Sequence, residues 1–443
     1  MPDFSEAPRR PRPSRIRLTL LLLVILHICA CCLSLVFISQ HYAYQHFYTF
    51  DAARVATALL NIAPLAVAAL FFAFSRFSFG YFVGFNLATM ILGYLWLAPF
   101  STLNYDHRLA SISAVVSLLA FLAPALFITA PLKQRIVLSE PAFERLLSGI
   151  LILGAVTVAI GASYNFRIVS VADIYDYRNQ LDFPRPLLYA NGLFSNALLP
   201  FAFAGFLVRG RRWQAGTALL LLLSFYPITL SKLALFGPAW LAFLALLGGL
   251  FEARIAAVLS LFLAILFGVL LLPFVKYGAI SLDHAMNYIG NINYRMIAVP
   301  SIAFDLYNDF FSKHDLTYFC QIGILKRFVS CPYSDYLSIV MSRNYQLGFV
   351  NASLFATEGI ASVGPYFAPI AVFACGLVIA LGNRLSCGLP PRFILLSGGL
   401  LSQVLMNIPL ATSLLTNGAA VVFLLWYITP RAFFAKPAAT EAT

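Results

Sequence analysis

Residues 18–39 read LTLLLLVILHICACCLSLVFIS, a run without a single Lys, Arg, Asp or Glu. An α-helix needs about 20 apolar residues to cross the hydrocarbon layer of a bilayer. A cleaved signal peptide has a shorter apolar core of roughly 7–15 residues, followed by a cleavage site of small residues. The end of this run, Phe37-Ile38-Ser39-Gln40, offers no such site. We therefore predict that residues 18–39 form a first membrane span.

The composition of the whole chain points the same way. Of its 443 residues, 61% are hydrophobic and 10% are charged, and the mean hydropathy is +0.86. An ordinary soluble domain carries about 25% charged residues. The net charge of +12 does not indicate a nucleic-acid partner, because the basic residues stand in short clusters between apolar runs. Soluble enzymes, nucleic-acid binders and disordered scaffolds are excluded, and the lipid bilayer is the expected surrounding.

Further apolar runs of similar length follow the first one. We predict an all-α polytopic membrane protein with about twelve transmembrane helices, because the runs are too long and continuous for the alternating strands of an outer-membrane barrel. The expected spans are residues 18–39, 53–74, 80–100, 110–130, 146–163, 187–208, 213–230, 233–250, 255–274, 362–382, 393–411 and 413–429.

The distribution of Lys and Arg predicts the orientation of these spans. Cytoplasmic loops carry an excess of Lys and Arg, and the basic N-terminus (residues 1–17) is expected on that side. An even number of spans then leaves the tail (residues 430–443) in the cytoplasm too. Asp3 and Glu6 argue against an organelle-targeting peptide.

Two outward segments are much longer than the other connections. Residues 164–186 interrupt the first block of nine spans (18–274), and a large loop of residues 275–361 separates it from spans ten to twelve (362–429). Connections longer than about 12–15 residues are uncommon unless they are functional. Both segments are rich in Tyr, Phe, Asp, Arg and Asn, so we expect ordered, partly helical caps that carry the chemistry.

Arg residues in outward segments run against the expected excess of Lys and Arg in cytoplasmic loops. The presence of each outward Arg therefore requires an explanation. One explanation is a surface ion pair with a nearby Asp. The other is a bound pyrophosphate, because the guanidinium group is a planar fork of donors that suits phosphate oxygens. Lys232, in the short outer hairpin, is expected either to anchor its span or to act as a further phosphate-binding cation. The candidate diphosphate-binding residues are Arg178, Arg185, Lys232 and Arg295.

Acid–base candidates are few in this chain. Glu358 is an acid in an apolar stretch, and a residue of this kind is a functional candidate by default; the alternative is a salt bridge to Arg343 or Arg295. His314 is either a general base or an ordinary loop histidine. No His/Cys cluster has metal-ligand spacing, so we expect no metal site. No nucleotide-binding motif is present either.

Cys320 and Cys331 lie eleven positions apart in the large outward loop. In an oxidising compartment such a pair can close a small disulfide loop. The remaining five cysteines fall in spans or inward segments and are expected to be packing residues.

Four features of the sequence resemble the oligosaccharide repeat-unit polymerases of the O-antigen polymerase (Wzy-like) class. They are the Tyr-Asp-Tyr-Arg motif at residues 175–178, the Ser-Lys pair at 231–232, Arg295 at the opening of the long loop, and the motif NASLFATEGIASVG at residues 351–364. The resemblance spans most of the chain, and the last motif is the strongest match.

The resemblance implies a glycosyltransferase of the bacterial inner membrane that works on its periplasmic face without metal or cofactor. Its substrate would be a polyprenyl-diphosphate-linked oligosaccharide, polymerised into an O-antigen, capsule or exopolysaccharide, with a chain-length regulator as an optional partner. Arg178, Arg185, Lys232 and Arg295 would hold the diphosphate. The general base would be Glu358, His314 or Asp309, in that order. Tyr175, Tyr177, Phe311 and Tyr318 would stack on sugar rings.

Three other functions remain open at this point. An O-antigen ligase, which transfers the finished glycan to a lipid acceptor, would have nearly the same site. A transporter of lipid-linked oligosaccharide predicts charged residues deep within several spans, whereas these spans are almost bare of charge. A membrane O-acyltransferase predicts a site built around histidine, and the chain has only six histidines.

Overall fold

The computed structural model describes residues 13–41, 47–170, 173–178, 180–323, 325–348 and 352–434. Within these ranges the regular structure is helical, and the β-type pairing is limited to an isolated bridge between Tyr48 and Ser101. The expected cytoplasmic segments at residues 1–12 and 435–443 lie outside the described residues.

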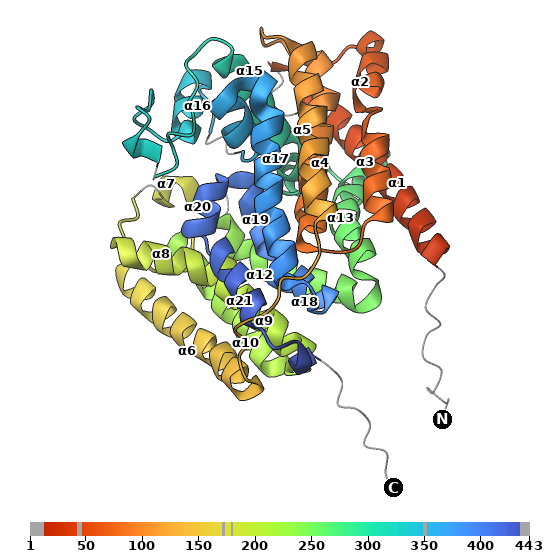
Figure 1. Ribbon diagram of the computed structural model, residues 1–443. Helices are drawn as coiled ribbons and strands as arrows, with labels where there is room; N and C mark the ends of the chain where they lie inside the picture. The colour runs from red at the N-terminus through yellow and green to blue at the C-terminus, as the bar shows by residue number, and fades with distance from the viewer. Residues whose placement is uncertain are drawn as a thin grey trace.

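The described chain is a helical, polytopic, membrane-embedded bundle (Figure 1). Within it, eight helical runs are long and apolar enough to cross a bilayer. They are α1 (Pro13–His41), α4 with η3 (Phe79–Phe100), α5 (His107–Phe127), α6 (Glu140–Tyr164), α8 to α9 (Arg185–Val208), α12 (Lys232–Leu250), α13 (Ala253–Lys276), and η7 with α17 (Phe355–Ser386). A ninth run, η2 and α2 (Ala52–Ile62) with α3 (Leu65–Phe74), is bent by 40° at Ala63-Pro64.

Besides the bent run at residues 53–74, three of the twelve expected spans are not single long helices in the structure. Residues 213–230 form α10 (Arg212–Ser224) and α11 (Tyr226–Thr229), and residues 393–411 form α18 (Pro391–Ser397) and α19 (Gly399–Asn407) before α20 (Leu410–Leu415) begins. The last expected span, 413–429, contains only the ten residues of α21 (Ala419–Ile428) as an unbroken helix.

The breaks have identifiable causes. Ile408 and Pro409 are extended, as expected for a proline and the residue before it, since the ring excludes the helical conformation there. Gly418 has a left-handed backbone (φ 83°) directly before α21, a conformation that glycine adopts at little cost.

Helix α4 lies at the centre of the bundle. Every one of its residues except Ala88 is buried, and it contacts α1, α5, α15 (Val299–Phe311), α17 and α19. Small residues allow its closest neighbours to approach: an added Cβ at Gly93 would stand 2.1 Å from Oγ of Ser301 on α15.

The large outward segment does not lie entirely outside the bundle, as a surface cap would. It contains α14 (Leu282–Asn291), η5 (Tyr294–Ala298), α15 and α16 (Leu337–Tyr345). All residues of α15 from Pro300 to Phe311 are buried, and Ser301 lies against Met90 of α4, with Oγ 3.3 Å from its carbonyl oxygen. The segment is therefore ordered and helical, but α15 enters the bundle.

One end of the bundle is rich in arginine. Arg17 lies over Phe74 at the end of α3, Arg254 donates to the carbonyl of Ser75, and Arg384 donates to that of Ala130. Arg209 and Arg211 pair with Glu144 at the same end. We call this the arginine-rich end.

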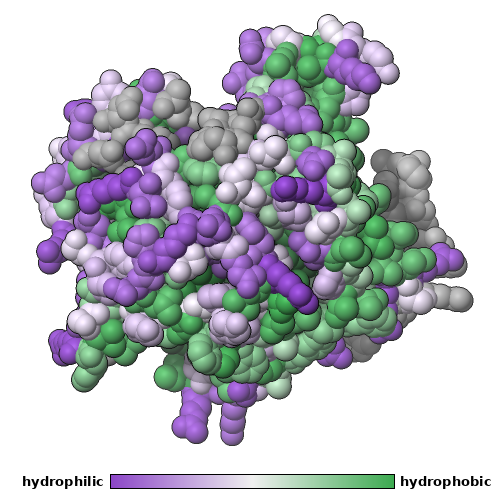
Figure 2. All heavy atoms as spheres, turned by 90° about the horizontal axis from the view of Figure 1, so that it is seen from above, coloured by the Kyte–Doolittle hydropathy of each residue, from purple (hydrophilic) through white to green (hydrophobic). Residues whose placement is uncertain are grey.

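The opposite end carries α15, α16 and α7 (Ile174–Arg178) (Figure 1). When this face is seen from above, hydrophilic side chains cover much of its left and centre, and hydrophobic side chains lie along its lower and right edges (Figure 2). We call this the outer end, because the two long segments that separate the spans lie here.

Candidate functional site

Three of the four predicted diphosphate-binding residues come together at the outer end. Lys232 is the first residue of α12. Ser231 is the N-cap residue of this helix, and Leu230 before it has a left-handed conformation (φ 48°). The charges of Arg295 and Arg178 both act on the ammonium group of Lys232. We call Arg178, Lys232 and Arg295 the outer cation cluster. Three elements far apart in the sequence, α7, α12 and η5, supply one cation each.

The arginines of this cluster have no counter-ion among the described residues. Within the described part of the chain, the structure records no ion pair and no side-chain hydrogen bond for Arg178 or Arg295. Both side chains are exposed. Like charges held together repel one another, so the arrangement favours a bound anion that would compensate them.

Two other basic residues of the outer segments have acidic partners. Lys313 pairs with Asp309, and Arg343 pairs with Asp335. Among the described residues, the alternative explanation of outward cations as surface ion pairs therefore applies to these two, and no ion pair is recorded for Arg178 or Arg295.

Arg185, the fourth predicted cation, is the exposed first residue of α8. The electrostatic contact with Lys232 is recorded for Arg178 and Arg295, and for Arg185 none is recorded in the described residues. We do not include Arg185 in the outer cation cluster.

Two predicted site residues lie in π-helical segments. Arg295 belongs to η5, and Glu358 belongs to η7 (Phe355–Ile360). Leu354, directly before η7, has a positive φ of 55° although it is not glycine. Single π-helical turns are rare and are frequent at functional sites, and strained backbone also concentrates there.

Glu358 is buried and its carboxylate binds backbone amides. Oε1 accepts a hydrogen bond from the amide of Leu410 (2.6 Å), and Oε2 accepts one from the amide of Leu354 (2.7 Å). The hydroxyl of Thr357 also donates to Oε2. The expected alternative, a salt bridge to Arg343 or Arg295, is not formed; Arg343 pairs with Asp335. Glu358 thus fastens the start of η7 to the start of α20.

The other two base candidates also have partners. Asp309 binds Lys313 and accepts a hydrogen bond from the hydroxyl of Tyr345 (2.7 Å). His314 stacks on Phe310, with ring centroids 3.9 Å apart, and its Nδ1 lies 2.9 Å from the carbonyl oxygen of the same residue. Both side chains are therefore fixed at the C-terminal end of α15, and no recorded contact joins them to the outer cation cluster.

The predicted sugar-stacking residues differ in their accessibility. Tyr177 is exposed beside the cluster on α7, and the guanidinium of Arg167 lies 5.8 Å from its ring centroid. Tyr318 is exposed as well. Phe311 is buried against Phe310 and Tyr333, so its ring packs in the core and offers no face to a ligand. The side chain of Tyr175 lies outside the described residues.

Cys320 and Cys331 are joined by a disulfide, with their Cα atoms 5.2 Å apart. The other five cysteines are free. Among the described residues, no group of three His, Cys, Asp or Glu side chains is placed so that it could hold a metal ion.

A buried carboxylate that the sequence analysis did not single out lies on α15. Asp305 is 1% exposed and accepts hydrogen bonds from the hydroxyls of Ser101 (2.7 Å) and Tyr105. It stands one helical turn before Asp309. An acid at this spacing inside an apolar helical run is the signal that could have identified it. Its contacts fasten α15 to the connection before α5.

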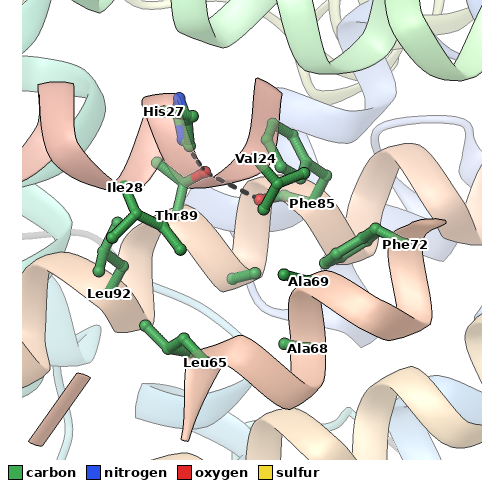
Figure 3. A pocket seen from close by; sticks show the side chains of 11 residues that line it. Val24, His27, Ile28, Leu65, Ala68, Ala69, Phe72, Phe85, Thr89 and Leu92 are labelled. Atoms are coloured by element: carbon green, nitrogen blue, oxygen red, sulfur yellow. Dashed lines mark hydrogen bonds between the residues drawn. The ribbon is translucent and has the colours of Figure 1, made fainter. Parts of the chain in front are cut away.

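A small cavity between α1, α3 and α4 offers no room for a ligand (Figure 3). Its volume is about 20 Å³ and its lining is almost entirely apolar. His27 stands at its edge with Nε2 2.9 Å from Oγ1 of Thr89, which itself donates to the carbonyl of Phe85 (Figure 3). A space of this size holds about one water molecule.

No protein-family model, curated protein or solved structure matches the chain.

Proposed function

We propose that this protein is a metal-independent glycosyltransferase that polymerises polyprenyl-diphosphate-linked oligosaccharide repeat units. We further propose that it works at the periplasmic face of the bacterial inner membrane and builds a surface polysaccharide. The observation that carries the proposal is the outer cation cluster, in which two exposed arginines with no counter-ion among the described residues act electrostatically on Lys232.

The cluster suits a diphosphate group. Each guanidinium presents a planar fork of donors to phosphate oxygens, and the lysine adds a compact positive charge. Hydrogen bonds to charged groups contribute about 1.5–3 kcal/mol each. Binding a diphosphate would replace the mutual repulsion of the cations with attraction.

The surroundings suit a lipid-linked substrate. Phe236 lies one helical turn below Lys232 on α12 and is 44% exposed, so the apolar face of α12 continues directly from the cation. Long basic side chains at span ends place their charge at the headgroup layer. A diphosphate at the cluster would let its polyprenyl chain run along this face into the bilayer.

The proposed reaction forms one bond and breaks one. The hydroxyl oxygen of the acceptor sugar attacks the anomeric carbon of the donor glycan, and a glycosidic bond forms. The bond from that carbon to the diphosphate oxygen breaks, and the polyprenyl diphosphate leaves with the electron pair. The proton of the hydroxyl passes to a base or to water. Arg178, Lys232 and Arg295 would stabilise the negative charge that grows on the leaving group.

The arrangement of charge supports the proposed orientation. The arginine-rich end carries Arg209, Arg211, Arg254 and Arg384, and an excess of such residues is typical of the cytoplasmic side. The outer cation cluster lies toward the other end, where the proposed lipid-linked glycan would be presented.

Substituting the cluster arginines tests the function. We expect Arg295→Ala and Arg178→Ala to abolish polymer at normal expression, because each removes charge-assisted hydrogen bonds worth about 1.5–3 kcal/mol, or about 10- to 100-fold in rate. Arg295→Lys should restore activity only in part, since lysine keeps the charge and loses the fork. The measurement is the length distribution of surface glycan in cells that carry each variant.

Arg343→Ala is the matched control, because Arg343 is an exposed arginine of the same segment that is already paired with Asp335. It should leave the glycan ladder unchanged. Full ladders from both cluster alanine variants would contradict the proposal. In a deletion strain, single attached repeat units indicate a polymerase, loss of all attached glycan indicates a ligase, and accumulation of unflipped carrier indicates a transporter.

A further inference from the structure

A cavity at the outer end is separate from the cation cluster. It has a volume of about 480 Å³ and lies between the disulfide-closed segment and the break that separates α19 from α20. We call it the outer cleft. A volume of this size is typical of a small-molecule site, and none of the residues predicted to bind diphosphate lines it.

The walls of the cleft come from two distant parts of the chain. Tyr333 and Tyr336 line it from the segment after Cys331, while Asn407 and Thr412 line it from the two sides of the extended Ile408-Pro409 break. Tyr307 and Thr357 contribute from α15 and η7. The Cys320–Cys331 disulfide and the Glu358–Leu410 hydrogen bond hold these two parts in place.

The chemistry of the lining is aromatic and mostly uncharged. Tyr336 is 80% exposed, so its ring is open to a ligand. Asn407, Thr412, Gln321, Ser334 and Ser338 add neutral donors and acceptors. Asp335 is paired with Arg343, and the carboxylate of Glu358 stands behind Thr357, occupied by backbone amides. Lys326 is an exposed basic residue of the lining.

A saccharide matches this combination. The C–H faces of a pyranose ring pack on aromatic side chains, and its hydroxyls pair with amides and hydroxyls, each of which both donates and accepts. A phosphate-bearing ligand is normally held by several cations, whereas Lys326 is the one basic residue among the described residues of the lining, and an apolar ligand would leave the amides unsatisfied. We propose that the outer cleft is a saccharide-binding site that recognises uncharged pyranose units.

The position of the cleft gives the site a role if the proposed function holds. Arg295 lies in η5, the segment directly before α15, and Tyr307 follows Arg295 by twelve residues, which corresponds to about 18 Å along a helix. An oligosaccharide of a few rings spans this distance. The cleft would therefore hold the glycan of one of the two reacting repeat units. The diphosphate in the outer cation cluster would belong either to that repeat unit or to the one with which it reacts.

Direct binding tests the cleft without any transferase activity. The probe is a set of methyl pyranosides of glucose, galactose, mannose, rhamnose and N-acetylglucosamine, added to the full-length protein in lipid nanodiscs. We expect saturation-transfer NMR to show transfer to at least one of them. Tyr336→Ala should raise the dissociation constant, obtained by titrating the transfer, by about tenfold, equivalent to about 1.4 kcal/mol. Tyr366→Ala is the matched control, because Tyr366 is similarly exposed (76%) but lies on α17 outside the cleft.

Asn407→Leu is the second variant, since leucine keeps the branched shape of the side chain and removes its hydrogen-bonding groups. It should lower the transfer while the protein elutes as the unmodified chain does. Absence of transfer to every probe, or equal transfer in Tyr336→Ala and Tyr366→Ala, would overturn the proposal. The two proposals fail separately: ladders that persist in Arg295→Ala count against the polymerase, whereas absent pyranoside binding counts against the cleft.

Discussion

At the scale of single residues, two buried acids of this chain are held by amides and hydroxyls rather than by opposite charges, whereas a third, Asp309, pairs with Lys313. Glu358 accepts hydrogen bonds from two backbone amides, and Asp305 accepts them from two hydroxyls. Several hydrogen bonds can compensate a carboxylate for its loss of water. Glu358, the first candidate for the general base, therefore also holds η7 to α20 through its hydrogen bonds.

We expect Glu358→Gln to lower the stability of the fold. One carboxylate oxygen becomes an NH₂ group, which cannot accept from an amide, so either Leu354 or Leu410 loses its buried acceptor. An unsatisfied buried donor costs about 1–3 kcal/mol. The measurement is the thermal unfolding of the detergent-purified chain, with Glu252→Gln, half-exposed beside Arg254, as the control.

A normal unfolding temperature for Glu358→Gln together with complete loss of polymer would give the opposite conclusion. Glu358 would then act as the base, and its hydrogen bonds would be dispensable for folding.

The sequence could identify the cluster arginines only as candidates. Arg178, Arg295 and Arg343 are equivalent by type and by outward position, and each had an ion pair as its alternative explanation. Only the fold separates them, because Asp335 stands eight residues before Arg343 and reaches it across the start of α16. The spacing of residues in the sequence does not predict which distant elements approach one another in the fold, as α7 and α12 do.

At the scale of elements, α15 depends on one close contact with α4. Gly93 leaves room for Ser301, whose Oγ would stand 2.1 Å from an added Cβ, and the carbonyl oxygen of Ile297 would stand 3.0 Å from it. The backbone of η5, which carries Arg295, therefore lies directly against α4. Any displacement of α15 would move the outer cation cluster.

We expect Gly93→Ala to destabilise the fold by about 1–3 kcal/mol, the usual cost of overpacking. Gly149→Ala on α6 is the control, because no atom lies within 4 Å of its added Cβ. Alanine there should be neutral or stabilising by up to about 1 kcal/mol. Thermal unfolding of the purified variants measures both effects.

Ser301→Ala should restore part of the stability lost in Gly93→Ala, since it removes the nearest atom but leaves the Ile297 carbonyl in place. Equal unfolding temperatures for Gly93→Ala and Gly149→Ala would show that α15 is not packed as the structure has it.

The lengths of the apolar runs predicted the long helices correctly, but they overestimated the lengths of the other helices. The runs at residues 393–411 and 413–429 are apolar enough for two spans, but Pro409 and Gly418 divide them into short helices. The entry of α15 into the bundle was not predictable by hydropathy, because Ser301, Asp305, Asn308 and Asp309 give it the polarity of a surface helix. Their buried partners on other elements compensate that polarity.

At the scale of the whole molecule, the two ends of the bundle differ in charge and in construction. The arginine-rich end has short connections, whereas the outer end carries α15, α16, the disulfide, the outer cation cluster and the outer cleft. The proposed function requires the outer end to face the compartment in which lipid-linked glycans are displayed. That requirement can be tested without measuring any activity.

Two exposed aromatic residues mark the two ends. Tyr277, at the outer end of α13, is 82% exposed, and Trp213, beside Arg212 at the arginine-rich end, is 91% exposed. We expect a membrane-impermeant maleimide to label Tyr277→Cys in intact cells and to label Trp213→Cys only after the cells are permeabilised, each relative to the unsubstituted chain. This follows from the excess of arginine on the cytoplasmic side. The reverse pattern would place the outer cation cluster in the cytoplasm, where a periplasmic polymerase could not use it.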